Sequence, residues 1–156
     1  MRVITATLTL TLAALATALA TASAAPQACG PQKVGDATVR TWCGPARATI
    51  TRGGKTMTIT GGSCTITKVE GITLFAVNVG RTTLPPAKPK ARAFSAGGSE
   101  LTAGSYPYWV VSFQTPGKDW VLRPSKTTVT ITKNARKGTF TGAMYGGGTA
   151  KGAWTC

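Results

Sequence analysis

TTVTITKNARKGTFTGAMYGGGTAKGAWTC, residues 127–156, alternates short Thr-rich runs with turn residues. In its first run Val129 and Ile131 share one face of an extended chain, and the threonines around them occupy the other. Asn- and Gly-rich segments then separate this run from two more. The stretch predicts three consecutive strands joined by tight turns, at Thr127–Thr132, Gly138–Tyr145 and Thr149–Thr155.

The same alternation continues toward the N-terminus. Ala48–Arg52 and Lys55–Thr60 flank a Gly53-Gly54 pair, which is typical of a β-hairpin. Cys64–Thr67 predicts a further short strand. Ile72–Val79 is apolar on both faces in its middle, which places it centrally in a sheet.

Between residues 80 and 105 the alternation disappears. Three prolines and a Gly-Gly pair lie in this segment, so we expect a long Pro/Gly-rich loop. Strand patterns return at Tyr106–Thr115 and Trp120–Arg123. With about eight strands and no helix after the N-terminal segment, the chain is predicted to be all-β, an antiparallel β-sandwich or flattened barrel.

The N-terminus has the pattern of a secretory signal. After Met1 and Arg2 an uncharged, Leu-rich run ends in Ala22-Ser23-Ala24, the small-x-small pattern that a signal peptidase accepts. We therefore expect a cleaved signal peptide at 1–24, and a single secreted domain at 25–156 with no stable membrane span after cleavage. The alternative is an uncleaved anchor, because the run is long enough to cross a bilayer.

Four cysteines in an exported protein favour two disulfides over a metal site. Their spacing contains no C-x-x-C pair, and the chain has no histidine to complete a zinc site. Three pairings remain open. We favour Cys29 with Cys43, which would tie the mature N-terminus to the first strand, and Cys64 with Cys156, which would fasten the last strand to the middle of the chain.

Several Gly, Thr and Cys landmarks carry a resemblance. They are Cys43-Gly-Pro-Ala, Gly53-Gly54-Lys55, Gly62-Ser63-Cys64, Gly138-Thr-Phe-Thr-Gly142 and Gly152-Ala-Trp-Thr-Cys156. In this order they resemble a loose group of small secreted actinobacterial-type β proteins, distantly similar to mycobacterial lipoprotein antigens. The resemblance implies the β fold and the Cys64–Cys156 bridge. This chain lacks the acylated cysteine of the lipoproteins, and the group supplies no catalytic residue to carry over.

Charge indicates the kind of partner. The chain has 18 basic and 4 acidic residues, and removing Arg2 with the signal changes its net charge from +14 to +13. Such an excess favours anionic cell-wall polymers or polysaccharide, through a field that salt screens. The one dense run, Lys88, Lys90 and Arg92, lies in the expected loop. We expect no specific nucleic-acid recognition, and oligomeric state is left open.

Enzymatic chemistry has few candidates. Without histidine, Ser-His and Cys-His nucleophile systems are excluded, and we expect no cofactor. Only Asp36, Glu70, Glu100 and Asp119 could act as carboxylate acid or base, and each lies beside turn residues. Ser125 and Lys126 would point to opposite faces of a strand. We therefore expect a non-enzymatic protein.

The best candidate for a recognition surface is a run of aromatic residues between 106 and 120. Within it Trp109, Val111 and Phe113 alternate as core residues do. That leaves Tyr106, Tyr108 and Trp120 as the exposed candidates, with Lys118 and Arg123 beside them to hold anionic groups.

Two function hypotheses follow. The first is a secreted or envelope-associated protein that adheres to anionic envelope polymers. The second is a small-molecule carrier or a protein-binding module of the protease-inhibitor type, in which the segment 80–105 would supply the exposed loop.

Overall fold

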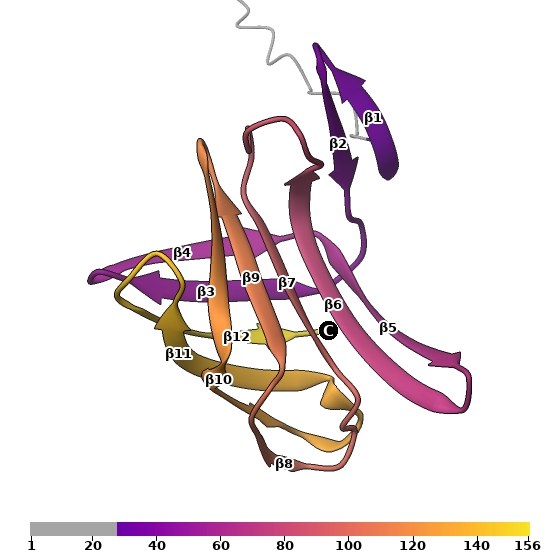
Figure 1. The fold of residues 1–156 in the computed structure, drawn as a ribbon. Coiled ribbons are helices and arrows are strands. Elements are labelled where there is room, and N and C mark those ends of the chain that lie inside the picture. The colour runs from indigo at the N-terminus through magenta and orange to yellow at the C-terminus, as the bar shows by residue number, and fades with distance from the viewer. Residues whose placement is uncertain (1–27) are drawn as a thin grey trace, which may run out of the picture.

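The computed structural model describes residues 28–156, and the expected signal peptide and its cleavage site lie outside them (Figure 1). These residues form twelve strands and one short 3-10 helix. None of the described residues belongs to a helix long and apolar enough to cross a membrane. The elements are β1 (Gly30–Val34), β2 (Ala37–Thr41), β3 (Arg47–Arg52), β4 (Lys55–Thr60), β5 (Gly62–Val69), β6 (Ile72–Thr83), β7 (Ala93–Gly98), β8 (Gly104–Tyr106), β9 (Val110–Thr115), β10 (Lys118–Ile131), η1 (Lys133–Ala135), β11 (Lys137–Met144) and β12 (Thr149–Thr155).

The strands form one antiparallel sheet that folds over on itself. Hydrogen-bonded neighbours follow the order β1-β2-β6-β7-β9-β10-β11-β12-β3-β4, with β5 added to β6 and β8 to β10. Strand β10 shifts register between Leu122 and Thr127, so its first residues pair with β9 and its last with β11. Figure 1 shows β6, β7 and β9 crossing the direction of β3, β4, β11 and β12. The predicted antiparallel all-β, sandwich-like fold is confirmed, and the sheet does not close into a barrel.

Turn chemistry explains the hairpins that the sequence predicted. Gly53 and Gly54 both have positive φ, 53° and 73°. A two-residue turn of this kind matches the twist of the strands that it joins. It sets the register of β3 and β4, in which Arg52 lies opposite Lys55. The predicted succession of three strands at residues 127–155 is also confirmed, because β10 pairs with β11 and β11 pairs with β12, both antiparallel.

The crossing strands form two layers, one with β6, β7 and β9 and the other with β3, β4, β11 and β12 (Figure 1). Large aromatic side chains fill the space between these two layers. The ring centroids of Trp109 and Trp154 lie 5.8 Å apart, and those of Phe94 and Phe140 lie 5.4 Å apart. Glycines make room for them: a Cβ on Gly138 would lie 2.2 Å from the indole of Trp154. The expected core positions Trp109, Val111 and Phe113 are all buried.

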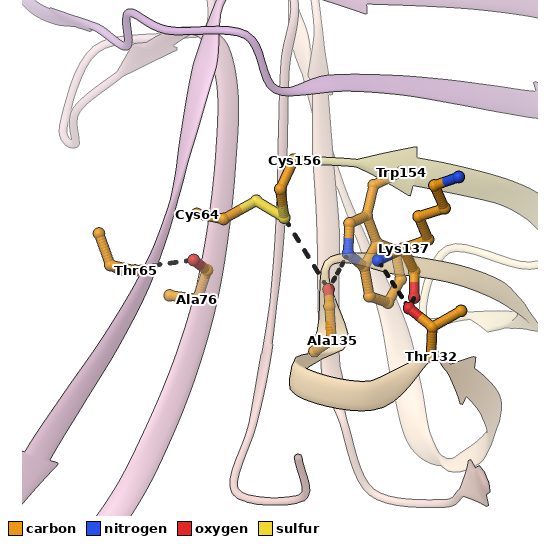
Figure 2. The surroundings of a disulfide bond; sticks show 8 residues. All are labelled: Cys64, Thr65, Ala76, Thr132, Ala135, Lys137, Trp154 and Cys156. Atoms are coloured by element: carbon orange, nitrogen blue, oxygen red, sulfur yellow. Dashed lines mark hydrogen bonds between the residues drawn. A yellow bond between two sulfur atoms is a disulfide. The ribbon is translucent and has the colours of Figure 1, made fainter. Parts of the chain in front are cut away.

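Both favoured disulfides are present. Cys29 pairs with Cys43, and Cys64 on β5 pairs with Cys156 just after β12. Figure 2 shows the second bond joining the two layers, beside Trp154 and Ala135. The indole Nε1 of Trp154 donates a hydrogen bond to the carbonyl oxygen of Ala135 at 3.0 Å. The C-terminus is therefore held by a covalent bond and by the core.

The expected long loop at 80–105 is wrong, because strand β7 runs through it. Its sequence, AFSAGG, lacks the β-branched residues by which strands are recognised. Small residues are required there by packing, since a Cβ on Gly98 would lie 2.3 Å from the indole of Trp109. The remaining loop, residues 84–92, is anchored: Lys90 N–H donates to Thr83 Oγ1 at 3.0 Å, and Gly117 N–H to Pro89 O at 2.7 Å.

Two further differences concern strand boundaries. The expected strand Tyr106–Thr115 is divided into β8 and β9, and Tyr108 between them has a φ of 65°, outside the extended region. The hairpin β1–β2 was not predicted; each of its strands has only five residues, and β1 is largely exposed although Ala37, Val39 and Thr41 of β2 are buried. These differences and β7 add strands, whereas the expected strands Trp120–Arg123 and Thr127–Thr132 are joined in β10, and the total is twelve compared with the expected eight or so.

Candidate functional site

The predicted site residues fall in several parts of the fold. Tyr108 is exposed, whereas Tyr106 is half-buried and donates a hydrogen bond to Thr102 O at 2.9 Å. Trp120 is only 8% exposed, so its expected exposure is wrong. Tyr106 pairs with Val129 near the end of β10, and Trp120 lies near the start of that strand. The three aromatic residues therefore do not form one surface.

The predicted cations are also divided. Lys88 and Lys90 are exposed in the loop 84–92. The guanidinium of Arg123 lies 5.4 Å from the ring centre of Tyr145. Arg92 and Lys118, in contrast, both reach the surroundings of Trp120. This convergence defines the candidate site.

The site is a groove of about 330 Å³ between the β3–β4 hairpin and the β9–β10 hairpin. The groove is referred to below as the basic groove, and its lining consists of Ile50, Arg52, Lys55, Thr56, Met57, Arg92, Phe113, Thr115, Pro116 and Trp120.

Trp120 forms the rigid wall of the basic groove. Its indole Nε1 donates to Thr115 Oγ1 at 3.1 Å, and its ring stacks on Phe113 with centroids 6.2 Å apart. Two cations lie against the ring: the Arg52 guanidinium carbon is 3.5 Å and the Lys118 ammonium nitrogen 4.3 Å from its centre. Attraction to the aromatic face holds both charges at the mouth of the groove.

The lining of the basic groove has one sign of charge. Arg52, Lys55 and Arg92 line it, Lys118 adjoins it through Trp120, and no carboxylate is among the lining residues. Asp119 follows Lys118 directly in sequence, but its side chain alternates to the other face of β10 and lines a separate hollow, which Trp120 also borders. Cations gathered around a partly enclosed space raise the local concentration of anions.

Arg52 and Lys55 were missed in the sequence. Each flanks the Gly53-Gly54 turn, and antiparallel pairing of the predicted hairpin already places them side by side. What the sequence did not contain is a local signal that the tip of this hairpin meets Trp120, which is 65 or more residues away along the chain.

None of the four carboxylates lines the basic groove. Asp36 and Glu70 are in the turns of the β1–β2 and β5–β6 hairpins. Glu100 accepts a hydrogen bond from the buried indole of Trp109 at 2.7 Å, which gives it a structural role. Within residues 28–156 no three His, Cys, Asp or Glu side chains gather as metal ligands would.

Fold and site together define a disulfide-linked, antiparallel β protein with a basic groove at one end. Comparison of the chain with known protein families, with curated proteins and with solved structures finds no match.

Proposed function

We propose that the protein is a secreted, non-enzymatic binding protein that adheres to anionic polymers of the cell envelope. The observation that carries this proposal is the convergence of Arg52, Lys55, Arg92 and Lys118 around Trp120, without a carboxylate in the groove lining. The Cys29–Cys43 and Cys64–Cys156 disulfides support an oxidising, extracellular compartment.

The chemistry of the groove favours a repeating, charged chain over a single small anion. Its cations come from four different segments of the chain and lie around an open groove. Phosphate, sulfate or carboxylate groups along a polymer can engage them one after another. Trp120 offers little bare ring surface, because Arg52 and Lys118 already lie on it. Charge, and not ring stacking, therefore provides the attraction.

The test measures binding of the mature protein to heparin and to purified anionic cell-wall polymer at several salt concentrations. The affinity should fall as salt rises, because screening shortens the range of the attraction. The double variant Arg52→Gln/Lys118→Gln should bind about ten-fold more weakly at low salt, since each exposed ion pair contributes up to about 1 kcal/mol.

The matched control is Lys33→Gln/Lys137→Gln, which removes the same charge from exposed positions on β1 and β11. It should retain most of the affinity. Equal losses in the two double variants would show that only the overall charge matters, and binding that is indifferent to salt would contradict the electrostatic proposal itself.

A second candidate function is carriage of a small ligand. A hollow of about 310 Å³ lies beside the Cys64–Cys156 disulfide, with Phe75 and Ile66 on its apolar side and Arg136 on its polar side. This volume is in the range of small-molecule sites. The test is the fluorescence of an apolar dye titrated with the protein, and the absence of any enhancement would remove this candidate.

A further inference from the structure

Strand β5 has one unpaired edge. It pairs with β6 along its whole length, and its other edge is covered only at Gly62, which exchanges hydrogen bonds of 3.2 Å with Gly44 O and Ala46 N–H. Within residues 28–156 no strand pairs with that edge between Ser63 and Val69. Figure 1 shows β5 as the outermost strand on its side of the molecule.

The register determines which backbone groups face outward. Gly80 N–H donates to Gly61 O at 2.7 Å, so Gly62 and Val79 form a pair without direct hydrogen bonds between them. Hydrogen-bonded pairs alternate along an antiparallel ladder, so the odd-numbered residues of β5 bond to β6. The N–H and C=O groups of three residues therefore point away from β6: Cys64, Ile66 and Lys68.

Four aliphatic side chains are exposed around this edge, among the exposed Thr65, Thr67 and Lys68. Ile66 is 52% exposed on the face that bears Cys64, while Val69, Ile72 and Leu74 are 49%, 58% and 42% exposed on the other face of the hairpin. An unpaired strand edge with aliphatic neighbours is a template for pairing with another chain, and proteins usually protect such edges. On β5 the only charged side chain is Lys68.

The hairpin is also electrically neutral in a strongly basic protein. Lys68 and Glu70 are the only charged residues between positions 62 and 80, whereas the chain as a whole carries +14. Elsewhere two copies would repel one another. The hairpin itself presents little net charge to a second copy, and a cation outside it, Arg136, lines the hollow that Ile66 also lines.

We propose that β5 pairs with β5 of a second copy, antiparallel about a two-fold axis, so that Ile66 lies opposite Ile66 of the second copy. In this register Cys64 lies opposite Lys68, and all three outward-facing residues form hydrogen-bonded pairs. No two like charges lie opposite each other. The result is a continuous sheet across the dimer, an interface that is separate from the basic groove and from the proposed polymer binding.

The first test is the mass of the mature protein in solution, measured by light scattering or sedimentation over a range of concentrations. We expect twice the mass of one chain at high concentration, with dimerisation strengthened by salt because salt screens the net positive charge. Ile66→Lys should yield monomers, since it places two lysines opposite each other. Ile72→Lys, which adds the same charge to β6 away from the edge, should leave the dimer intact.

The second test fixes the register. Residues of a hydrogen-bonded antiparallel pair have Cα atoms about 5.5 Å apart, within the range of about 4.4–6.8 Å that a disulfide spans. Ile66→Cys should therefore form an intermolecular disulfide on mild oxidation. Thr67→Cys should not, because Thr67 lies opposite Thr65 of the second copy. Circular dichroism of each variant establishes that the fold is retained.

Three outcomes would overturn the proposal. The first is a monomer at every concentration together with no cross-link in Ile66→Cys. The second is a dimer that Ile72→Lys dissociates and Ile66→Lys does not, which would assign the contact to the outer apolar face. The third is binding of the monomer to lipid vesicles that both lysine variants abolish, which would assign the apolar hairpin to a membrane surface.

Discussion

The guanidinium carbon of Arg52 lies 3.5 Å from the centre of the Trp120 ring. Arg52 ends strand β3, and Trp120 is the third residue of β10, where that strand pairs with β9. This contact joins the two hairpins that form the basic groove. Lys118 lies near the same ring, so the position of two of the groove's cations depends on one indole.

Replacing Arg52 should lower the stability of the fold, because the contact with the Trp120 ring is lost. Arg52→Ala should lower the free energy of unfolding by about 0.5–1 kcal/mol, the usual range for an exposed cation on an aromatic face. The control is Arg47→Ala at the other end of β3, for which the described residues include no ring contact. Urea denaturation measures both variants, and an equal loss in both would show that the ring contact contributes nothing.

The two disulfides should differ in their contribution to stability. Cys64 and Cys156 are separated by 92 residues, Cys29 and Cys43 by 14. The entropy of loop closure predicts a loss of about 4.6 kcal/mol for Cys64→Ala/Cys156→Ala and about 3 kcal/mol for Cys29→Ala/Cys43→Ala. Urea denaturation of the two double variants gives the order, and a larger loss from the short loop would contradict this account.

A larger residue at Gly138 should destabilise the fold, because the side chain of Trp154 occupies the space that a Cβ would need. Gly138→Ala would place a Cβ 2.2 Å from Trp154, and overpacking of this kind costs about 1–3 kcal/mol. Gly146→Ala is the matched control, because the nearest atom to its new Cβ is 3.9 Å away. Thermal unfolding should show a clear fall in Tm for the first variant and little change for the second. Similar values would mean that the core rearranges around the added methyl group.

The buried indole of Trp109 should depend on its acceptor. Its Nε1 donates to Glu100 Oε2 at 2.7 Å, and Trp109 is 1% exposed. Glu100→Leu should cost about 1–3 kcal/mol, because a buried donor is left unsatisfied. Glu100→Gln retains an acceptor and should cost less. Urea denaturation of the two variants compares them, and no difference would show that solvent replaces the carboxylate.

The parts of the fold that the sequence predicted are those with local signals. Gly53-Gly54 allowed the β3–β4 hairpin to be located, and the alternation of Val129 and Ile131 with threonine located the end of β10. Strand β7 was missed because its residues are small for a steric reason that involves a distant part of the chain. At Gly98, for example, the indole of Trp109 leaves no room for a side chain. A signal of that kind cannot be read from neighbouring residues.

The candidate site was predicted only in part for the same reason. Arg92, Lys118 and Trp120 were identified by residue type, but Trp120 was expected at the surface. Phe113 stacks with its ring and Arg52 lies over the ring, and these two residues come from different hairpins. The type of a residue indicates whether its side chain could bind a ligand. Whether that side chain is exposed depends on how distant segments pack against it.

The sequence by itself therefore determined the all-β class, the main turns, the excess of positive charge and a preference among the disulfide pairings. These properties follow from backbone preferences and side-chain chemistry, which act over a few residues. The tertiary structure alone decided that four cations gather at the groove that Trp120 lines and that β5 keeps an unpaired edge. Both depend on which strands become neighbours, because the sheet folds over and brings together segments that are far apart along the chain.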